Sequence, residues 1–336
     1  MVKIIEAKTT QSSAIKILVD TLNSLLTDVN ITFYPTQDTD KNNDSDSELD
    51  NSDSSEYESD SDNSDSEKEK EKKISKKGGI IIKEVNKTIT VLVYCKLDGW
   101  EEFHYNYHKS KLTIGVKLPN LLKCLKCMTH FDTMSWIIEE EDMNKLIVIL
   151  ESTERNEKKV FKLNLMDLDD EKYEIEKIEF PYRLTLPSSD FHKYCKDMAS
   201  VMANKMEIQC TNNMVFFSGK SDIGTVDFQV GESMGGLEIE INTDKNEIVQ
   251  GNFELKYLTI FTKCTNLCNE VKLFLKNDYA LVVRYQVAAL GEIKLDSNGD
   301  PRIIADDRDY WYLETGKNYT LQIFERNVNT KIDIVA

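Results

Sequence analysis

The feature that most constrains the fold is a repeated order of helical and strand-like segments on either side of residues 164–180. Apolar residues recur with helical spacing in four segments, at 12–26, 118–128, 187–202 and 252–265. Two of these segments precede residues 164–180 and two follow them, and short strand-like segments surround all four. This order predicts an internal duplication, with two α+β domains whose helices cover one face of antiparallel sheets.

The chain of 336 residues has room for about two domains. We expect an N-terminal domain over 1–163, a connector over 164–180, a C-terminal domain over 181–296 and an extension over 297–336. Ser188 or Ser189 is placed to cap the third helix. Strands are expected at 29–34, 78–84, 88–97, 145–151, 158–165, 205–210, 214–218, 224–230, 235–241, 270–276 and 279–286, with further strand-like runs at 309–313 and 318–325.

Residues 36–77 form an acidic, low-complexity segment with fifteen Asp or Glu and seven Lys. So few apolar residues cannot offset the entropy lost on ordering, and we expect this segment to be a disordered insert in the first domain. It carries a net charge of −8 out of −17 for the whole chain, so the remainder is acidic too. Contact with nucleic acid would therefore require a localised basic surface rather than overall attraction.

The sequence offers no pattern for catalysis, and we expect no catalytic residues and no cofactor. Phosphate-binding glycine loops, zinc-protease helices and nucleophile elbows are all missing. Cys124 and Cys127 form a C-x-x-C, but they lie in an apolar helical pattern, which favours small core residues over a zinc site. Seven cysteines at irregular spacing fit reduced thiols, and the N-terminus has no secretory apolar core, so we expect an intracellular protein.

Lysines recur on one face of the predicted helices. Lys123 and Lys126 are three residues apart, as are Lys193 and Lys196, and spacings of three and seven fall on one helix face. Such lysines are usually just solvated, but in an acidic chain a bias on equivalent helices is less expected. Parallel basic helix faces would suit a phosphate backbone, which is contacted without regard to base sequence.

Several segments in order resemble the proliferating cell nuclear antigen family of DNA sliding clamps. They are L-M-D-L-D at 165–169, P-S-S-D-F-H-K-Y-C-K-D-M at 187–198, F-E-L-K-Y-L-T-I-F-T-K-C-T at 253–265 and A-L-V-V-R-Y-Q-V-A-A-L-G-E-I-K at 280–294. The segment S-A-I-K-I-L-V-D-T-L-N-S-L-L is similar to the first helix of the family. Apart from the acidic insert and the last forty or so residues, the resemblance covers the chain. The added segments and the composition suggest a diverged, viral member of the family.

The resemblance implies a homotrimeric ring that encircles double-stranded DNA, with helices lining the hole and sheets outside. It implies as partners a DNA polymerase, a clamp loader and repair proteins that dock a short peptide motif, at a nuclear or cytoplasmic viral replication site and away from membranes. Two basic family positions on the first helix are Ile17 and Asn23 here, so the lining is thinner. The positions it implies for DNA contact are Lys16, Lys123, Lys126, Lys193, Lys196, Lys256 and Lys263.

The resemblance also implies where subunits and partner peptides bind. Subunits of the family join by pairing edge strands, here at 155–164 and 223–229, with contact positions Lys159, Val160, Phe161, Leu163, Ile223, Thr225 and Asp227. The matching positions of the peptide pocket are Leu168, Tyr173, Ile175 and Ala280, and more loosely Val85 and Leu295. A second hypothesis is a regulatory paralogue that keeps the fold without encircling DNA as a homotrimer, either as a hetero-oligomer subunit or as a monomer capped by its extension.

Overall fold

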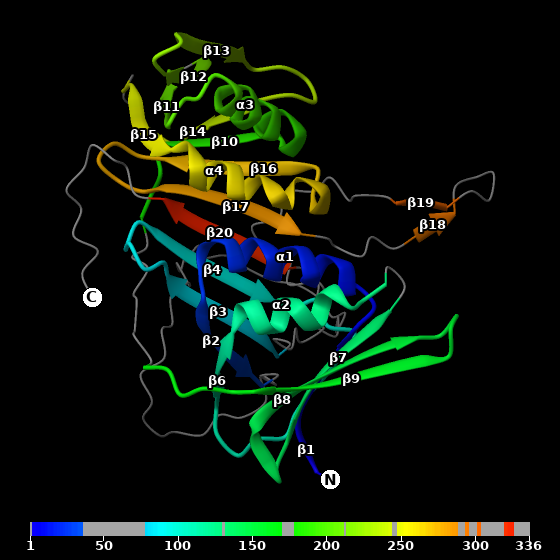
Figure 1. The fold of residues 1–336 in the computed structure, drawn as a ribbon. Helices are drawn as coiled ribbons and strands as arrows, with labels where there is room; N and C mark the ends of the chain where they lie inside the picture. The colour runs from blue at the N-terminus through cyan, green and yellow to red at the C-terminus, as the bar shows by residue number, and fades with distance from the viewer. Residues whose placement is uncertain are drawn as a thin grey trace, which may run out of the picture.

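The computed structural model describes residues 2–35, 78–129, 132–169, 178–211, 213–243, 247–287, 293–295, 301–303 and 319–325. Figure 1 shows the helices lying on one side of the molecule, with the sheets behind them. The predicted insert at 36–77 and the strand-like run at 309–313 lie outside the described residues, as does most of the extension.

The first half of the chain builds nine strands and two helices in its described residues. Both helices were expected, and each follows directly or nearly so from a strand. The elements are β1 Lys3–Thr9, α1 Ser12–Leu25, β2 Asp28–Tyr34, β3 Gly79–Val85, β4 Val91–Leu97, β5 Glu102–Tyr105, β6 Leu112–Lys117, α2 Leu118–Lys126, β7 Thr133–Glu139, β8 Asp142–Ser152 and β9 Glu157–Asn164.

The second half repeats this order of strands around two helices. Its elements are β10 Tyr182–Pro187, α3 Ser188–Ser200, β11 Lys205–Cys210, β12 Met214–Lys220, β13 Thr225–Gly231, β14 Glu238–Ile241, β15 Val249–Glu254, α4 Leu255–Phe261, the 3-10 helix η1 Thr262–Leu267, β16 Glu270–Leu275, β17 Leu281–Val287, β18 Ile293–Leu295, β19 Pro301–Ile303 and β20 Tyr319–Glu325. The expected α+β architecture with antiparallel sheets is therefore confirmed.

One nine-stranded sheet runs through both halves in the order β14-β10-β16-β17-β20-β4-β3-β2-β6. A five-stranded sheet, β5-β1-β7-β8-β9, belongs to the first half, and a four-stranded sheet, β13-β12-β11-β15, belongs to the second.

Two buried serines form the same kind of tertiary hydrogen bond, one in each half. Ser12 Oγ donates to the carbonyl of Asp132 at 2.6 Å, and Ser188 Oγ donates to the carbonyl of Cys268 at 2.6 Å. Each ties the start of the first helix of its domain to the segment after the second helix.

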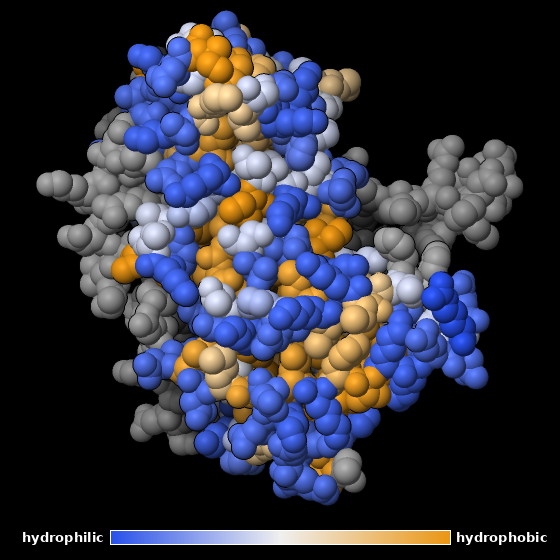
Figure 2. Space-filling model, viewed as in Figure 1, coloured by the Kyte–Doolittle hydropathy of each residue, from blue (hydrophilic) through white to orange (hydrophobic). Residues whose placement is uncertain are grey.

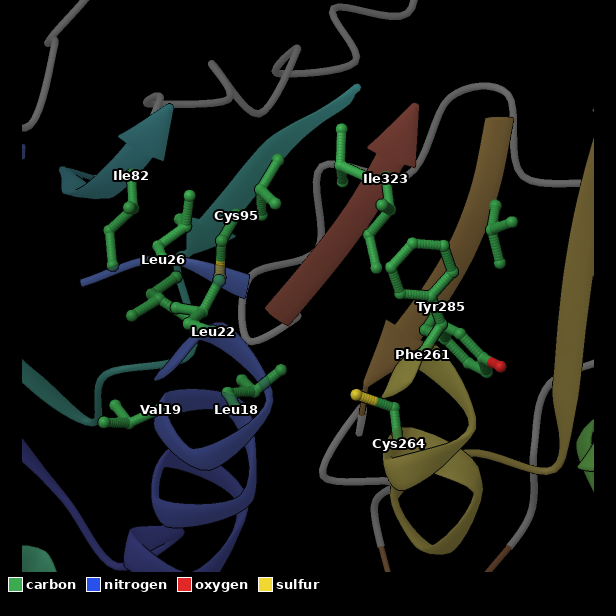
Figure 3. Close-up of a cluster of buried hydrophobic side chains, with 14 of the residues drawn as sticks. Leu18, Val19, Leu22, Leu26, Ile82, Cys95, Phe261, Cys264, Tyr285 and Ile323 are labelled. Atoms are coloured by element: carbon green, nitrogen blue, oxygen red, sulfur yellow. The ribbon is translucent and has the colours of Figure 1, made fainter. Parts of the chain in front are cut away.

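Strand β20 comes from the segment predicted as an extension, and it joins the two halves. It pairs along its length with β17 of the second half and with β4 of the first, so the C-terminal part of the chain supplies an interior strand of the large sheet. Ile323, at the centre of β20, is fully buried between Val283 and Val93. Figure 3 shows side chains from α1, β4, β20, β17 and α4 meeting at this junction.

Polar contacts also cross the junction. Tyr257 on α4 is buried, and its hydroxyl lies against the turn between β3 and β4. Thr90 Oγ1 donates to Tyr257 Oη at 3.1 Å, and Asn86 Nδ2 donates to the same oxygen at 3.3 Å. On the other sheet face, β20 is tied to the neighbouring β17, because the Gln322 amide oxygen accepts from Arg284 Nε at 2.9 Å when it faces that residue.

The structure corrects several local expectations. Neither Ser188 nor Ser189 caps α3: its N-cap residue is Pro187, and Ser188 instead uses its hydroxyl for the tertiary bond described above. The fourth helix begins at Leu255 because residues 249–254 pair with β11 as β15, and it ends in a 3-10 turn. The strands not predicted from the sequence are β1, β5, β6, β7, β10, β15, β18 and β19. No helix in the described part of the chain is long and apolar enough to cross a bilayer.

Candidate nucleic-acid and subunit interfaces

The helices turn their apolar sides to the sheets and leave a polar surface outside. On α1, Ile15, Leu18 and Leu22 are buried, and α2 and α3 follow the same pattern with Leu121 and Phe191. This amphipathic spacing fixes which side chains remain available to solvent. Figure 2, viewed from the helix side, shows a mostly hydrophilic surface with apolar atoms between the helices.

Four of the seven lysines predicted to contact DNA project from this surface without an ionic partner. Lys123 and Lys126 on α2, and Lys193 and Lys196 on α3, are exposed. No ion pair within the described residues involves any of them, and the same holds for the half-buried Lys16 on α1. The structure therefore presents two exposed basic pairs, one on the second helix of the first domain and one on the first helix of the second domain.

The other two lysines of that set are engaged within the chain. Lys256 forms an ion pair with Glu254 and lies 4.6 Å from the centre of the Tyr257 ring. The hydrogen bond to Glu254 raises the pKa of Lys256 above its usual value, so Lys256 stays positively charged at neutral pH. Lys263 Nζ lies 2.8 Å from Asp20 Oδ2 and donates to Ser24 Oγ at 2.8 Å, and both partners belong to α1. Asp20 and Ser24 were not among the predicted site residues.

Two of the strand edges carry the side chains predicted for subunit contact. β9 is an edge strand of the five-stranded sheet, and β13 is an edge strand of the four-stranded sheet. No strand among the described residues pairs with the outer side of either one. An open edge presents unpaired backbone N–H and C=O groups, which is a template for pairing with another strand.

Side chains alternate between the two faces of these edge strands. Phe161 and Leu163 on β9 are half-buried against the core, and Lys159 lies on the same face; Val160 points outward with 50% of its surface exposed. On β13 the predicted Thr225 and Asp227 are exposed, and so is Ile223 before the strand. The apolar residues of β13 that pack on the core were not predicted, although their alternation in the sequence shows them: Val226, Phe228 and Val230.

The edges also differ in charge. β9 carries Lys158, Lys159 and Lys162 and one acid, Glu157, whereas β13 carries Asp227, with Asp222 three residues before it and Glu232 just after. Lys158 and Lys159 form ion pairs within the chain, with Glu151 and Glu157. The edges are thus opposite in net charge, and Lys162 has no ion pair among the described residues.

The start of the predicted connector is fixed against the first domain. Met166 N donates to the carbonyl of Gly115 on β6 at 3.0 Å, and Asn30 Nδ2 donates to the carbonyl of Asp169 at 3.0 Å. A side chain at Gly115 would collide with the Met166 carbonyl and with Leu168, so glycine permits this close approach. Leu168 is half-buried at this contact.

The remaining positions of the predicted peptide pocket are only partly covered. Val85 on β3 and Ala280, just before β17, are half-buried, and Leu295 lies on β18. Tyr173 and Ile175 lie outside the described residues. The sequence reading missed an aromatic group at the end of the connector, where the Phe180 ring lies 5.7 Å from Phe274 and 5.8 Å from Tyr279 between ring centres.

The cysteines are free thiols, and most are buried. Burial raises the pKa of Cys264 to about 11 and that of Cys210 to about 12, which keeps both protonated. The interpretation of Cys124 and Cys127 as core residues is wrong for Cys127, which is exposed because it follows the last turn of α2. No cluster that could hold a metal ion is found within the described ranges.

The fold and these surfaces define a two-domain protein with its helices on one side, an exposed set of lysines there, and two open sheet edges. Family models for the proliferating cell nuclear antigen match this chain, the N-terminal domain at residues 69–173 and the C-terminal domain at 174–296. The chain belongs to the proliferating cell nuclear antigen family.

Individual relatives agree with this assignment. A probable DNA polymerase sliding clamp of Acanthamoeba polyphaga mimivirus is 30% identical over 293 residues, which is 87% of this chain and 61% of that protein. Proliferating cell nuclear antigen 2 of Drosophila melanogaster is 30% identical over 220 residues, 65% of this chain and 83% of that protein. The crystal structure of the Entamoeba histolytica antigen shares the fold, with a TM-score of 0.68 at 19% identity over 97% of this chain and 99% of that one.

Proposed function

We propose that this chain is a DNA sliding clamp: three copies close into a ring around duplex DNA, and the ring tethers a polymerase to its template. The observation that carries the proposal is the helix side, where the exposed pairs Lys123/Lys126 and Lys193/Lys196 stand on an otherwise acidic protein. Lysines of this kind contact phosphates without reading bases. The family is non-enzymatic, and such a protein would act wherever DNA is copied inside the cell.

Ring closure follows from the two open edges. Pairing β9 of one subunit with β13 of the next satisfies the backbone groups on both edges and joins the lysine-rich edge to the acidic one. Because the two surfaces are different, each subunit can bind a neighbour on either side. A head-to-tail contact of this kind generates a closed ring when the rotation between subunits closes.

The chain's own junction supplies a register for this pairing. When the two halves are compared, β9 corresponds to β20, because β9 pairs with β8 as β20 pairs with β17. In the same way β13 corresponds to β4, because β13 pairs with β12 as β4 pairs with β3. The β20–β4 pair therefore joins the two strand positions that β9 and β13 leave open. Matching the cross-strand pairs of the two halves puts Phe161 at the position of Ile323 and Val226 at that of Val93. Since Ile323 pairs with Val93, we expect Phe161 of one subunit to face Val226 of the next.

The competing hypothesis of a monomer capped by its extension receives no support from the described residues. The part of the extension that forms β20 lies inside the chain's own sheet, and it covers neither β9 nor β13. Partner docking is proposed beside Leu168 and Ala280, where the connector begins and where β17 begins, for a polymerase, a clamp loader and other proteins that carry a clamp-binding peptide.

Encirclement of DNA can be tested directly on the full-length protein. A loaded ring should stay on closed circular DNA through gel filtration at raised salt and should leave when one cut linearises the circle. Retention on both forms would indicate ordinary binding, and retention on neither would contradict the sliding-clamp proposal.

The lysines give a second test. Replacing Lys193 and Lys196 by Glu should abolish polymerase stimulation, because phosphate attraction becomes repulsion. The matched double substitution of Lys109 and Lys276, which lie exposed between strands, should leave stimulation unchanged. Equal loss in both variants would point to net charge rather than to the helix side.

A further inference from the structure

Lys263 stands out among the lysines of the helix side because its partners belong to the other domain. Its Nζ lies 2.8 Å from Asp20 Oδ2 and 2.8 Å from Ser24 Oγ, two residues one turn apart on α1. Lys263 itself belongs to η1 of the second domain. The two lysine contacts therefore cross the boundary between domains on the side that faces DNA in the proposed function.

The neighbouring residue fixes this geometry. Cys264 is fully buried, and its sulfur lies 3.6 Å from Thr21 Oγ1 on α1. Burial also keeps Cys264 uncharged by raising its pKa to about 11. With Cys264 seated against Thr21, η1 holds Lys263 beside Asp20 and Ser24 before any ligand arrives. A surface ion pair is usually weak because forming it costs the entropy of ordering a long side chain. Here the fold already restricts Lys263, so part of that entropy cost has been met before the pair forms.

The other lysines of the helix side differ in this respect. Lys193 and Lys196 are exposed and have no ion pair within the described residues, so a phosphate meets them without displacing a protein group. Lys256 pairs with Glu254, two residues away on its own side of the junction. Only the Lys263 ion pair, among those of the described residues, joins the two domains.

We propose that Asp20, with Ser24, holds Lys263 in a bridge between the domains and so withholds this lysine from the DNA phosphates. Asp20 is then a positioning residue that limits how strongly the helix side grips DNA, an inference that rests on the proposed function. The effect suits a clamp, because each phosphate contact adds affinity that a sliding ring must repeatedly break. Asp20 neutralises Lys263, so the pair as a whole carries no net charge toward the backbone.

The salt dependence of binding to a short fluorescent DNA duplex counts phosphate contacts, since the slope of log affinity against log salt changes by ~0.9 for each contact. In the otherwise unaltered protein, Lys263→Gln should leave the slope unchanged, whereas Lys193→Gln should reduce it by ~0.9 for each subunit whose Lys193 contacts a phosphate. Asp20→Asn, which keeps the side-chain shape, should steepen the slope by ~0.9 for each Lys263 that it releases, and the double variant with Lys263→Gln should return to the original value.

A slope for Lys263→Gln that falls as far as that of Lys193→Gln would overturn the inference, because Lys263 would then be an ordinary phosphate contact. An unchanged slope for Asp20→Asn would overturn it too. If Lys193→Gln also has no effect, the proposed DNA contact itself fails, so the two failures can be told apart.

A measurement without DNA tests the Lys263–Asp20 ion pair separately from its effect on DNA binding. Acetylation of lysine amines, followed by mass spectrometry, should label Lys263 more slowly than Lys196 in the unaltered protein. In Asp20→Asn the two rates should become similar while the rate at Lys196 stays the same. Equal rates in the unaltered protein would contradict the bridge.

Discussion

The junction between the two domains and the outer edges of the molecule use equivalent strands in opposite ways. At the junction, β20 and β4 are paired, Ile323 is fully buried, and polar contacts from Tyr257 complete the contact. At the edges, the equivalent strands β9 and β13 have no partner on their outer side within the described chain, and Phe161 is only half-buried. The β20–β4 junction is thus paired within the chain, whereas the outer sides of β9 and β13 are open. This arrangement is expected if the open edges pair with those of other copies of the chain.

Breaking the closed junction should have the largest effect. Ile323→Asp places a charge without a partner between β17 and β4, which should cost about 4 kcal/mol of unfolding free energy or more and leave little folded protein. Urea unfolding followed by circular dichroism measures it. An effect below ~1 kcal/mol would mean that β20 is not part of the stable fold.

The same substitution at the equivalent open position should act on assembly instead. Phe161→Asp should leave each chain folded, at a cost of about 1–2 kcal/mol, because the side chain is only half-buried. It should convert the assembly to monomers, since the charge would face Val226 of the neighbouring subunit. Gel filtration and circular dichroism together distinguish this result, and a folded, fully assembled variant would refute the proposed register.

The polar contact at the closed junction should contribute less than its apolar core. Tyr257→Phe removes the hydroxyl that accepts from Thr90 and Asn86 while keeping the buried ring. We expect a loss of about 1 kcal/mol in unfolding free energy, the usual net value of a hydrogen bond. Tyr34→Phe, at an exposed position on β2, is a matched control. Unfolding curves identical to those of the control would assign the junction to apolar packing alone.

Charge at the open edge should have the smallest effect. In the proposed register Asp227 lies diagonally between Lys158 and Lys162 of the neighbour. Asp227→Lys should weaken assembly by about 0.3 kcal/mol for each of these two diagonal pairs, and adding Lys162→Glu should recover part of the loss. Sedimentation equilibrium gives both values. Failure of the second change to restore any assembly would argue against this alignment of the strands.

Local patterns predicted much of this architecture, and contacts between distant segments set the rest. The helical spacing of Ile15, Leu18 and Leu22 fixed one buried side of α1, so its place on the sheet followed from amphipathicity. The alternation of β13 likewise identifies Val226 and Phe228 as its inward side, although the sequence reading did not use it.

Two features could not be predicted because they join distant residues. The strand-like pattern at 318–325 does not show that β20 pairs with β4, more than two hundred residues earlier in the chain. Lys263 and Asp20 look like ordinary surface residues until η1 and α1 are packed together. The resemblance placed Lys263 among the DNA contacts, and only the packed helices reveal its partner.

The most direct test of the central claim is the mass of the full-length chain in solution at micromolar concentration. Sedimentation velocity or light scattering should give three times the chain mass of 38.7 kDa, and Phe161→Asp should reduce this to a single chain. A monomer in the unaltered protein, with β9 and β13 both open, would contradict the account.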